Sequence, residues 1–197
     1  MNSVAPQTKQ AAATAIEAAG AHYVDVAVMA PVDPARLAVP LLLAGARSAG
    51  AMTLLAALGF TNIRIVGDAV GRASSIKMIR SVMVKGMEAL TAECVLAAQK
   101  AEVLDEVLAS LDASDRPKPW AERADYNLDR MMIHGQRRAA EMEEVVKTLD
   151  HLGTGAMMTR GTVGRQRAIG ELNLKQPATG LTHKIDQVNR KGGMQTA

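Results

Sequence analysis

The sequence predicts a mainly α-helical protein, with the last part of an open α/β sheet over residues 1–67, an all-α domain over residues 68–174 and a loosely ordered basic tail over residues 175–197. Composition is the first ground for this fold class. Ala, Leu and Met supply most of the apolar residues and aromatic residues only 2% of the chain, a mixture that favours helices packed through small contacts. The second ground is that strand-like segments alternate with helical ones before Gly67 and no convincing strand pattern follows it.

The first part of the chain alternates helix and strand patterns. In chain order the pattern predicts a helix, two strands, a helix and a strand, at residues 7–19, 22–28, 40–45, 48–58 and 62–66. Gly20 and Gly59 follow the two helices, as glycine often does at a helix C-terminus, and Gly67 ends the last strand. Such alternation indicates α/β units. The order is short for a complete doubly wound sheet, so we interpret it as the last third of one.

The part after Gly67 predicts helices only. Apolar residues recur every three or four positions between residues 69 and 100, at Ile76, Ile79, Met83, Met87, Leu90, Cys94 and Ala97. This stripe predicts one long amphipathic helix of about 45 Å, at about 1.5 Å per residue. Further helices are expected at residues 102–111, 121–132, 134–152 and 162–172. Cys94, the single cysteine, lies on the stripe and is expected to be buried, and one cysteine excludes a disulfide framework or a cysteine-based zinc set.

Charge and hydropathy argue against nucleic acid and membrane as partners. The net charge is +3, and basic and acidic residues alternate instead of forming a basic stripe with interleaved aromatics. The basic excess after Arg160 is expected to be a solvated tail, although a weak nucleic-acid-binding role for it remains an alternative. The longest apolar stretches, at residues 37–46 and 51–60, are too short to span a bilayer. The first twenty residues do not form a signal peptide, so we expect a cytoplasmic protein.

A dinucleotide-binding turn is absent from the sequence. Such a turn has the pattern G-x-G-x-x-G between a strand and a helix, where bare backbone approaches the pyrophosphate. The nearest approximation, Gly153-Thr154-Gly155, has Met158 at the final position and follows a predicted helix. The sequence therefore predicts part of an α/β sheet without the Gly-rich turn that binds the pyrophosphate in dinucleotide-binding sheets.

Two polar clusters are candidates for chemistry. Gly71 opens the long helix and places Lys77 about two turns into it; by composition alone this is a surface lysine. In the second cluster, His134, Arg138 and Glu141 share one face of a predicted helix. Their spacing fits a ladder of charge pairs. The alternative is an anion pocket, because arginine offers a planar fork to carboxylate or phosphate.

Several segments resemble one enzyme superfamily, in matching order across nearly the whole chain. Residues 2–6 resemble the end of its D-x-S-T-x-x-P segment, residues 25–31 its D-A-P-V-S-G-G loop, and residues 71–81 its G-x-x-x-x-x-K-x-x-N helix start. The chain thus resembles the β-hydroxyacid dehydrogenases of the 6-phosphogluconate dehydrogenase superfamily, in particular a branch with a distinctive helical C-terminal domain of the DUF1932 type. The resemblance implies a remnant of a Rossmann domain, with the Gly-rich half absent, followed by the helical domain.

The resemblance also implies a function and a site. It implies an NAD(P)-dependent oxidoreductase that acts on the CH–OH group of a small, anionic, hydroxyacid-like substrate, uses NAD or NADP, and forms a homodimer. Lys77 takes the position of the catalytic acid/base, and Ser3 that of a threonine near nicotinamide and substrate. The expected substrate-binding residues are Ser3, Met29, Ala30, Pro31, Ser81, His134 and Arg138.

Two departures from the superfamily pattern bear on the substrate. Met29-Ala30-Pro31 replaces the Ser-Gly-Gly that cradles a carboxylate, and Ser81 replaces an asparagine. His134 and Arg138 are therefore attractive substitutes for anion recognition. Because the Gly-rich half is missing, we expect the chain to be inactive alone. The alternative function is a non-catalytic helical dimerisation module.

Overall fold

The computed structural model describes residues 1–115 and 117–193, and it divides the chain into two compact units, Met1–Met87 and Glu88–Ala197. The described part is mainly helical with one small sheet, which confirms the predicted fold class. The division falls inside helix α3 (Arg72–Lys100), and not after Gly67 as expected. The reason is that the first turns of α3 pack on the sheet through Ala73 and Ile76, so they belong to the first unit.

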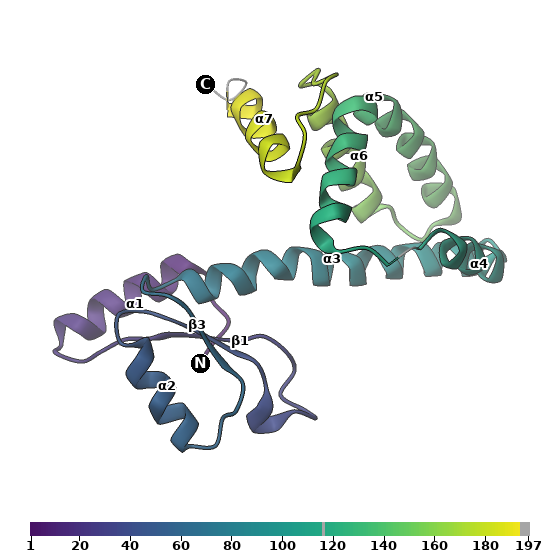
Figure 1. The fold of residues 1–197 in the computed structure, drawn as a ribbon. Coiled ribbons are helices and arrows are strands. Elements are labelled where there is room, and N and C mark those ends of the chain that lie inside the picture. The colour runs from purple at the N-terminus through teal and green to yellow at the C-terminus, as the bar shows by residue number, and fades with distance from the viewer. Residues whose placement is uncertain (116, 194–197) are drawn as a thin grey trace. The chain divides into compact units, whose positions relative to one another are not determined.

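The first unit is a three-stranded sheet between helices. Its elements are α1 (Pro6–Ala18), β1 (Asp25–Val28), the short 3-10 helix η1 (Arg36–Ala38), β2 (Leu41–Ala44), α2 (Ser48–Ala57), β3 (Ile63–Gly67) and the start of α3. The strand order is β1-β2-β3, with β1 antiparallel and β3 parallel to the central β2. Helix α2 lies on one side of the sheet, and α1 and the start of α3 lie on the other (Figure 1).

The central strand is buried on both faces. Leu41 and Leu43 pack with Leu55 of α2, whereas Leu42 and Ala44 pack with Ala73 of α3. Successive side chains of a strand point to opposite faces, so both faces of β2 must be apolar. This explains why β2 is an uninterrupted run of apolar residues.

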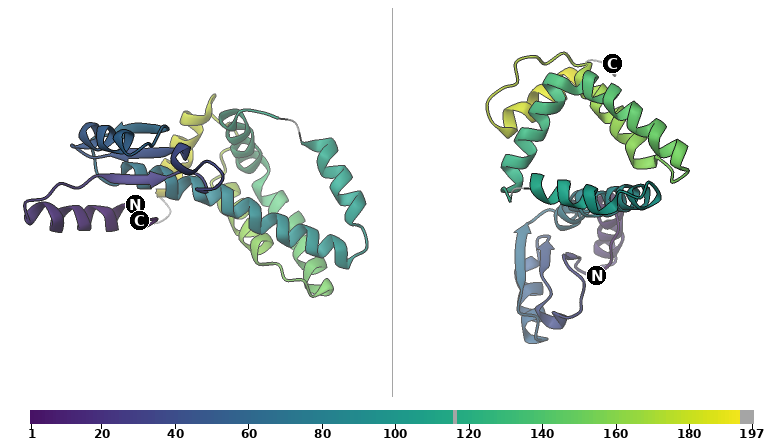
Figure 2. Two further views of the ribbon diagram at one scale, coloured as in Figure 1. Left: turned by 90° about the horizontal axis from the view of Figure 1, so that it is seen from below. Right: turned by 90° about the vertical axis from the view of Figure 1, so that its right-hand side faces the viewer.

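The second unit contains the end of α3, α4 (Leu104–Ser114), α5 (Trp120–Leu152), α6 (Met157–Gly170) and α7 (Leu181–Gly193). Two helices were expected at residues 121–132 and 134–152, but they form the single helix α5, because Ile133 between them does not break a helical backbone. Figures 1 and 2 show that α5 is bent. Its second half and α6 share an apolar core that includes Ala139, Val146 and Val163.

A glutamate from α3 caps α6. The Glu93 carboxylate accepts hydrogen bonds from the backbone N–H groups of Met158 and Thr159, both at 2.9 Å, and from the Thr159 hydroxyl at 2.5 Å. The first N–H groups of a helix have no partner within it, and α6 has no capping side chain of its own at Ala156. Burial alone would raise the pKa of Glu93, but these hydrogen bonds outweigh it and lower the pKa below its ordinary value.

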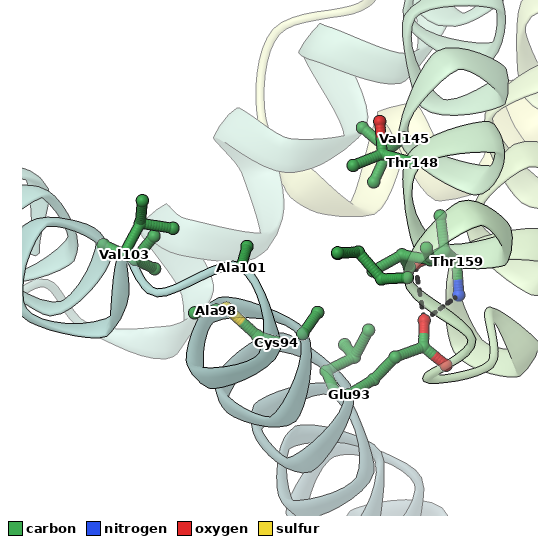
Figure 3. A pocket seen from close by; sticks show the side chains of 13 residues that line it. Glu93, Cys94, Ala98, Ala101, Val103, Val145, Thr148 and Thr159 are labelled. Carbon is green, nitrogen blue, oxygen red and sulfur yellow. Dashed lines mark hydrogen bonds between the residues drawn. The ribbon is translucent and has the colours of Figure 1, made fainter.

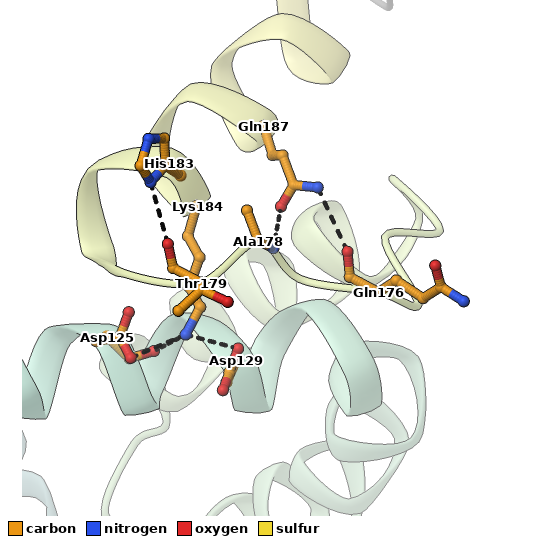
Figure 4. A network of polar contacts seen from close by, with 8 residues as sticks. All are labelled: Asp125, Asp129, Gln176, Ala178, Thr179, His183, Lys184 and Gln187. Atoms are coloured by element: carbon orange, nitrogen blue, oxygen red, sulfur yellow. Dashed lines mark hydrogen bonds and ion pairs between the residues drawn. The ribbon is translucent and has the colours of Figure 1, made fainter.

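The end of the chain is docked by a buried lysine. Lys184 of α7 lies 2.9 Å from Asp125 and 2.8 Å from Asp129, both on α5 (Figure 4). Burial works to lower the pKa of Lys184, yet the bonds to Asp129 and Asp125 raise it above its ordinary value. Residues 181–193 therefore form a packed helix in the region expected to be a loosely ordered tail.

The single cysteine, Cys94, was expected to be buried but is exposed, because its position on α3 faces an open apolar hollow instead of a packed neighbour.

Within the described ranges, no helix is both long enough and apolar enough to cross a membrane.

Candidate functional site

Lys77 and Ser3 are brought together in the first unit. The Lys77 ammonium donates a hydrogen bond of 2.6 Å to the Ser3 hydroxyl, although the two residues are 74 positions apart. Ser81 lies one turn further along α3, where its hydroxyl donates to the Lys77 backbone carbonyl at 2.9 Å. An amine and a hydroxyl in direct contact form a pair that can exchange protons with a bound group.

A buried carboxylate holds the helix that carries Lys77. Asp25, at the start of β1, accepts hydrogen bonds from the Ser74 backbone N–H at 2.9 Å and from the Ser74 hydroxyl at 2.7 Å. Lys9 of α1 lies 3.6 Å from the same carboxylate, and the side chains of Lys9 and Asp25 are only 3% and 0% exposed. A carboxylate is favourable at a helix N-terminus. Since Ser74 is one turn before Lys77, Asp25 positions the start of α3 and with it the lysine.

The loop after β1 offers few groups to a carboxylate. The Met29 side chain packs into the apolar cluster that includes Ala73, and its backbone N–H is used by the Pro40 carbonyl at 2.9 Å. Ala30 and Pro31 are exposed, and proline has no backbone N–H. The loop therefore presents fewer donors than the Ser-Gly-Gly it replaces.

His134 and Arg138 lie in the second unit, where they line separate hollows. His134 lines one of about 240 Å³ with Asn173 and Lys175, and Arg138 lines one of about 330 Å³ with Arg130 and Gln166. Neither forms the expected ladder with Glu141, which instead pairs with the exposed Arg137.

An apolar hollow of about 310 Å³ lies between α3, α4 and α5 in the second unit (Figure 3). Cys94, Ala98 and Val145 line it, and Glu93 stands at its polar end beside Thr159. The sequence analysis did not single out this hollow, because its apolar residues are spread over three helices.

Sequence analysis also missed that Lys9 is buried beside Asp25 and that Arg130 and Gln166 line the same hollow as Arg138. Lys9 is one of several polar residues along α1, and nothing in the local pattern marks it as buried. Arg130 and Gln166 come from different helices, so no spacing rule connects them.

Several solved protein structures are similar to this chain. A conserved hypothetical protein from Sinorhizobium meliloti 1021 is 38% identical, with a TM-score of 0.51 over 97% of this chain and 64% of that one. A conserved protein of unknown function, described as structurally similar to 3-hydroxyacid dehydrogenases, is 29% identical with a TM-score of 0.52 over 90% of this chain and 67% of that one. An imine reductase from Myxococcus stipitatus shares the fold, with a TM-score of 0.66 at 15% identity over 94% of this chain and 68% of that one.

A match to a family model, together with the structural matches, identifies the family. Residues 98–169 match a domain of unknown function, DUF1932. Together with the structural matches, this places the chain in the β-hydroxyacid dehydrogenase superfamily, with a C-terminal domain of the DUF1932 type.

The chain is shorter than its relatives. An uncharacterized 28.5 kDa protein from Methanothermus fervidus is 32% identical over 85 residues, which are 43% of this chain and 34% of that protein. The chain likewise spans 64% of the Sinorhizobium meliloti protein.

Proposed function

We propose that the chain carries the acid/base part of an NAD(P)-dependent oxidoreductase that acts on the CH–OH group of a small hydroxyacid-like substrate. The observation that carries the proposal is the 2.6 Å contact between the Lys77 amine and the Ser3 hydroxyl. The family supports it, because Lys77 takes the position of the superfamily's catalytic lysine. Relatives in fold include an imine reductase solved with NADP+, which supports NAD or NADP as the cofactor.

The chemistry assigned to this chain is proton transfer. In oxidation, the neutral Lys77 amine accepts the proton of the substrate hydroxyl, and in the reverse direction the ammonium returns it to the forming alkoxide. Ser3 accepts a hydrogen bond from the lysine and so orients it. A nicotinamide cofactor, when bound, would supply the hydride acceptor, and the residues of this chain would take part only in the proton transfer.

The described residues do not fit the pyrophosphate of NAD or NADP. Two strand-to-helix turns are available, β2 to α2 and β3 to α3. In the first, the Ser48 hydroxyl is bonded to the Gly45 carbonyl at 2.7 Å, and in the second, Asp25 already binds the Ser74 N–H at the start of α3. The pyrophosphate therefore requires a Gly-rich turn that the 197 residues do not contain, and we expect no turnover by this chain alone.

On the substrate side, the proposal rests on residues of the first unit, namely Ser81 and the loop at residues 29–31. His134 and Arg138, in the second unit, are proposed separately as anion-binding residues.

The test is replacement of Lys77 by Met in a chain extended upstream by a nucleotide-binding half. We expect turnover to fall by about 10²–10⁴-fold, the usual share of general acid–base catalysis, with NADH and NADPH binding unchanged in titration calorimetry. Lys85→Met, on the same helix and exposed, is the matched control and should retain full turnover. Normal turnover by the Lys77 variant would contradict the assignment.

A second candidate function, a helical dimerisation module, is favoured by one observation. Apolar side chains stand exposed on α3 in the first unit, with Ile79 at 72%, Val82 at 71% and Met83 at 47%. Contiguous exposed apolar residues mark interaction surfaces, and a second copy of the chain could cover them. We therefore propose a homodimer. Light scattering at micromolar concentration should give the mass of two chains, and Val82→Glu should shift the protein toward monomer; a wild-type monomer would exclude this function.

A further inference from the structure

Three adjoining hollows follow the first half of α5 in the second unit. Their volumes are about 450, 440 and 330 Å³. The first and second share Asp115, Lys118 and Arg123 in their linings, and the second and third share Tyr126 and Asn127. Together they form one groove, called the α5 groove below, which runs from the connection before α5 to the contact of α5 with α6.

Cationic and aromatic side chains follow one another along the α5 groove. In chain order they are Lys118, Trp120, Arg123, Tyr126, Arg130 and Arg138. Those between residues 120 and 130 are three or four positions apart, so they share one face of the helix. Trp120 and Tyr126 are 54% and 57% exposed. The chain has only one Trp and two Tyr, so two of its three largest aromatic side chains stand open in this groove.

Each of the two rings lies beside an arginine. The Arg123 guanidinium is 5.2 Å from the centre of the Trp120 ring, and the Arg130 guanidinium is 6.0 Å from the centre of the Tyr126 ring. Such cation–π contacts help to hold both partners in place. The rings are about 9 Å apart along the helix, at about 1.5 Å per residue. The groove therefore offers two flat apolar surfaces, each with a positive charge beside it.

The α5 groove is more positive than the chain as a whole. Among the described residues that line it, four are cationic and one, Asp115, is acidic. Asp115 lies 3.3 Å from Arg123, and the other three cationic side chains form no ion pair with a described residue. Asp125 and Asp129 of the same helix bind Lys184 and do not line the groove. Charges of both signs alternate along the sequence, but here the fold separates them.

We propose that the α5 groove binds single-stranded nucleic acid. The phosphates of the strand pair with Lys118, Arg130 and Arg138. Two of its bases stack on Trp120 and Tyr126. A positively charged groove with aromatic platforms is the general design of sites that bind single strands without sequence preference. An acidic peptide would use the cations but leave the two rings without stacking partners, and a duplex keeps its bases stacked on each other.

The proposal is independent of the proposed catalysis. All the residues that line the α5 groove belong to the second unit, whereas Lys77 and Ser3 belong to the first.

The experiment is titration of the full chain with oligouridylate and with oligothymidylate of about 12 nucleotides, followed by the fluorescence of Trp120, the single tryptophan. A base stacked on the indole quenches its emission, so the signal comes from the groove itself. We expect saturable quenching by at least one of the two, and the tighter binder identifies the strand as RNA or DNA. An abasic strand of the same length keeps the phosphates and should compete at least about fivefold more weakly.

Variants test the two kinds of contact. Tyr126→Ala should weaken binding at least about fivefold, because it removes one stacking platform. Arg130→Gln should reduce the slope of log K against log salt concentration by about 0.7, the share of one phosphate contact on a single strand. Arg165→Gln, exposed on α6 and outside the groove, removes the same charge and should bind as wild type.

Several outcomes would overturn the proposal: no saturable binding of either strand, unchanged binding by Tyr126→Ala, or an equal loss in the Arg165 control. Competition by polyglutamate as strong as by the oligonucleotides would also overturn it and would indicate an acidic protein partner. Circular dichroism checks that each variant is folded. Should Tyr126→Ala fail to fold, Trp120→Ala tests the other platform through the fluorescence anisotropy of a labelled strand, with the same loss expected and wild-type affinity as the contrary result.

Discussion

Replacement of Asp25 by Asn is expected to destabilise the first unit by about 3–5 kcal/mol, the usual cost of leaving one partner of a buried ion pair without the other. The Lys9 side chain is 3% exposed and lies 3.6 Å from the Asp25 carboxylate, so it would lose its ionic partner in buried surroundings. The variant also weakens the two bonds that hold Ser74 at the start of α3. Amide hydrogen exchange in β2 measures the change, because this strand forms the centre of the sheet.

The matched control for Asp25 is Asp33→Asn. Asp33 is 88% exposed and lies 4.0 Å from Arg36, and exposed pairs of this kind contribute at most about 1 kcal/mol. If both variants lost the same small amount, the Asp25 carboxylate would not be an anchor. A second readout follows from position: because Ser74 precedes Lys77 by one turn, Asp25→Asn should also lower turnover in the extended chain, whereas Asp33→Asn should not.

Replacement of Gly135 by Ala is expected to destabilise the second unit by about 1–3 kcal/mol, as overpacking of a dense core does. Helices α5 and α6 meet where Gly135 faces Gly170. A Cβ atom at Gly135 would lie 2.4 Å from the Gln166 carbonyl oxygen and 2.9 Å from the Gly170 Cα. Both contacts are with backbone, so no side-chain rotation relieves them and the helices must move apart. Hydrogen exchange along α6 should increase.

Gly164→Ala tests the same substitution without the clash. Gly164 lies on α6, and a Cβ atom there would meet nothing within 4 Å. Alanine is the better helix former by about 1 kcal/mol, so this variant should be slightly more stable than wild type. Loss of stability in Gly164→Ala, or none in Gly135→Ala, would mean that the close approach of α5 and α6 does not limit the packing.

Local patterns were sufficient for the three strands of this protein, for the helices before residue 115 and for part of the site, but not for α7. Residues 40–45 indicated a short strand, and the apolar stripe of α3 indicated its length, because such local patterns are properties of neighbouring positions. Lys77 and Ser3 were selected by resemblance, and the structure places their side chains in contact. Their catalytic roles remain predictions.

Contacts between distant positions depended on the tertiary structure. Asp25 is one polar residue of a predicted strand in sequence, yet it is the buried partner of Lys9 and Ser74, which lie in two different helices. His134 and Arg138, four residues apart, line different hollows. Lys184 docks α7 onto Asp125, 59 positions earlier. The physical reason is the same in each case: burial and charge pairing depend on which helices pack together, and helical periodicity shows which face of a helix is apolar but not which neighbour covers it.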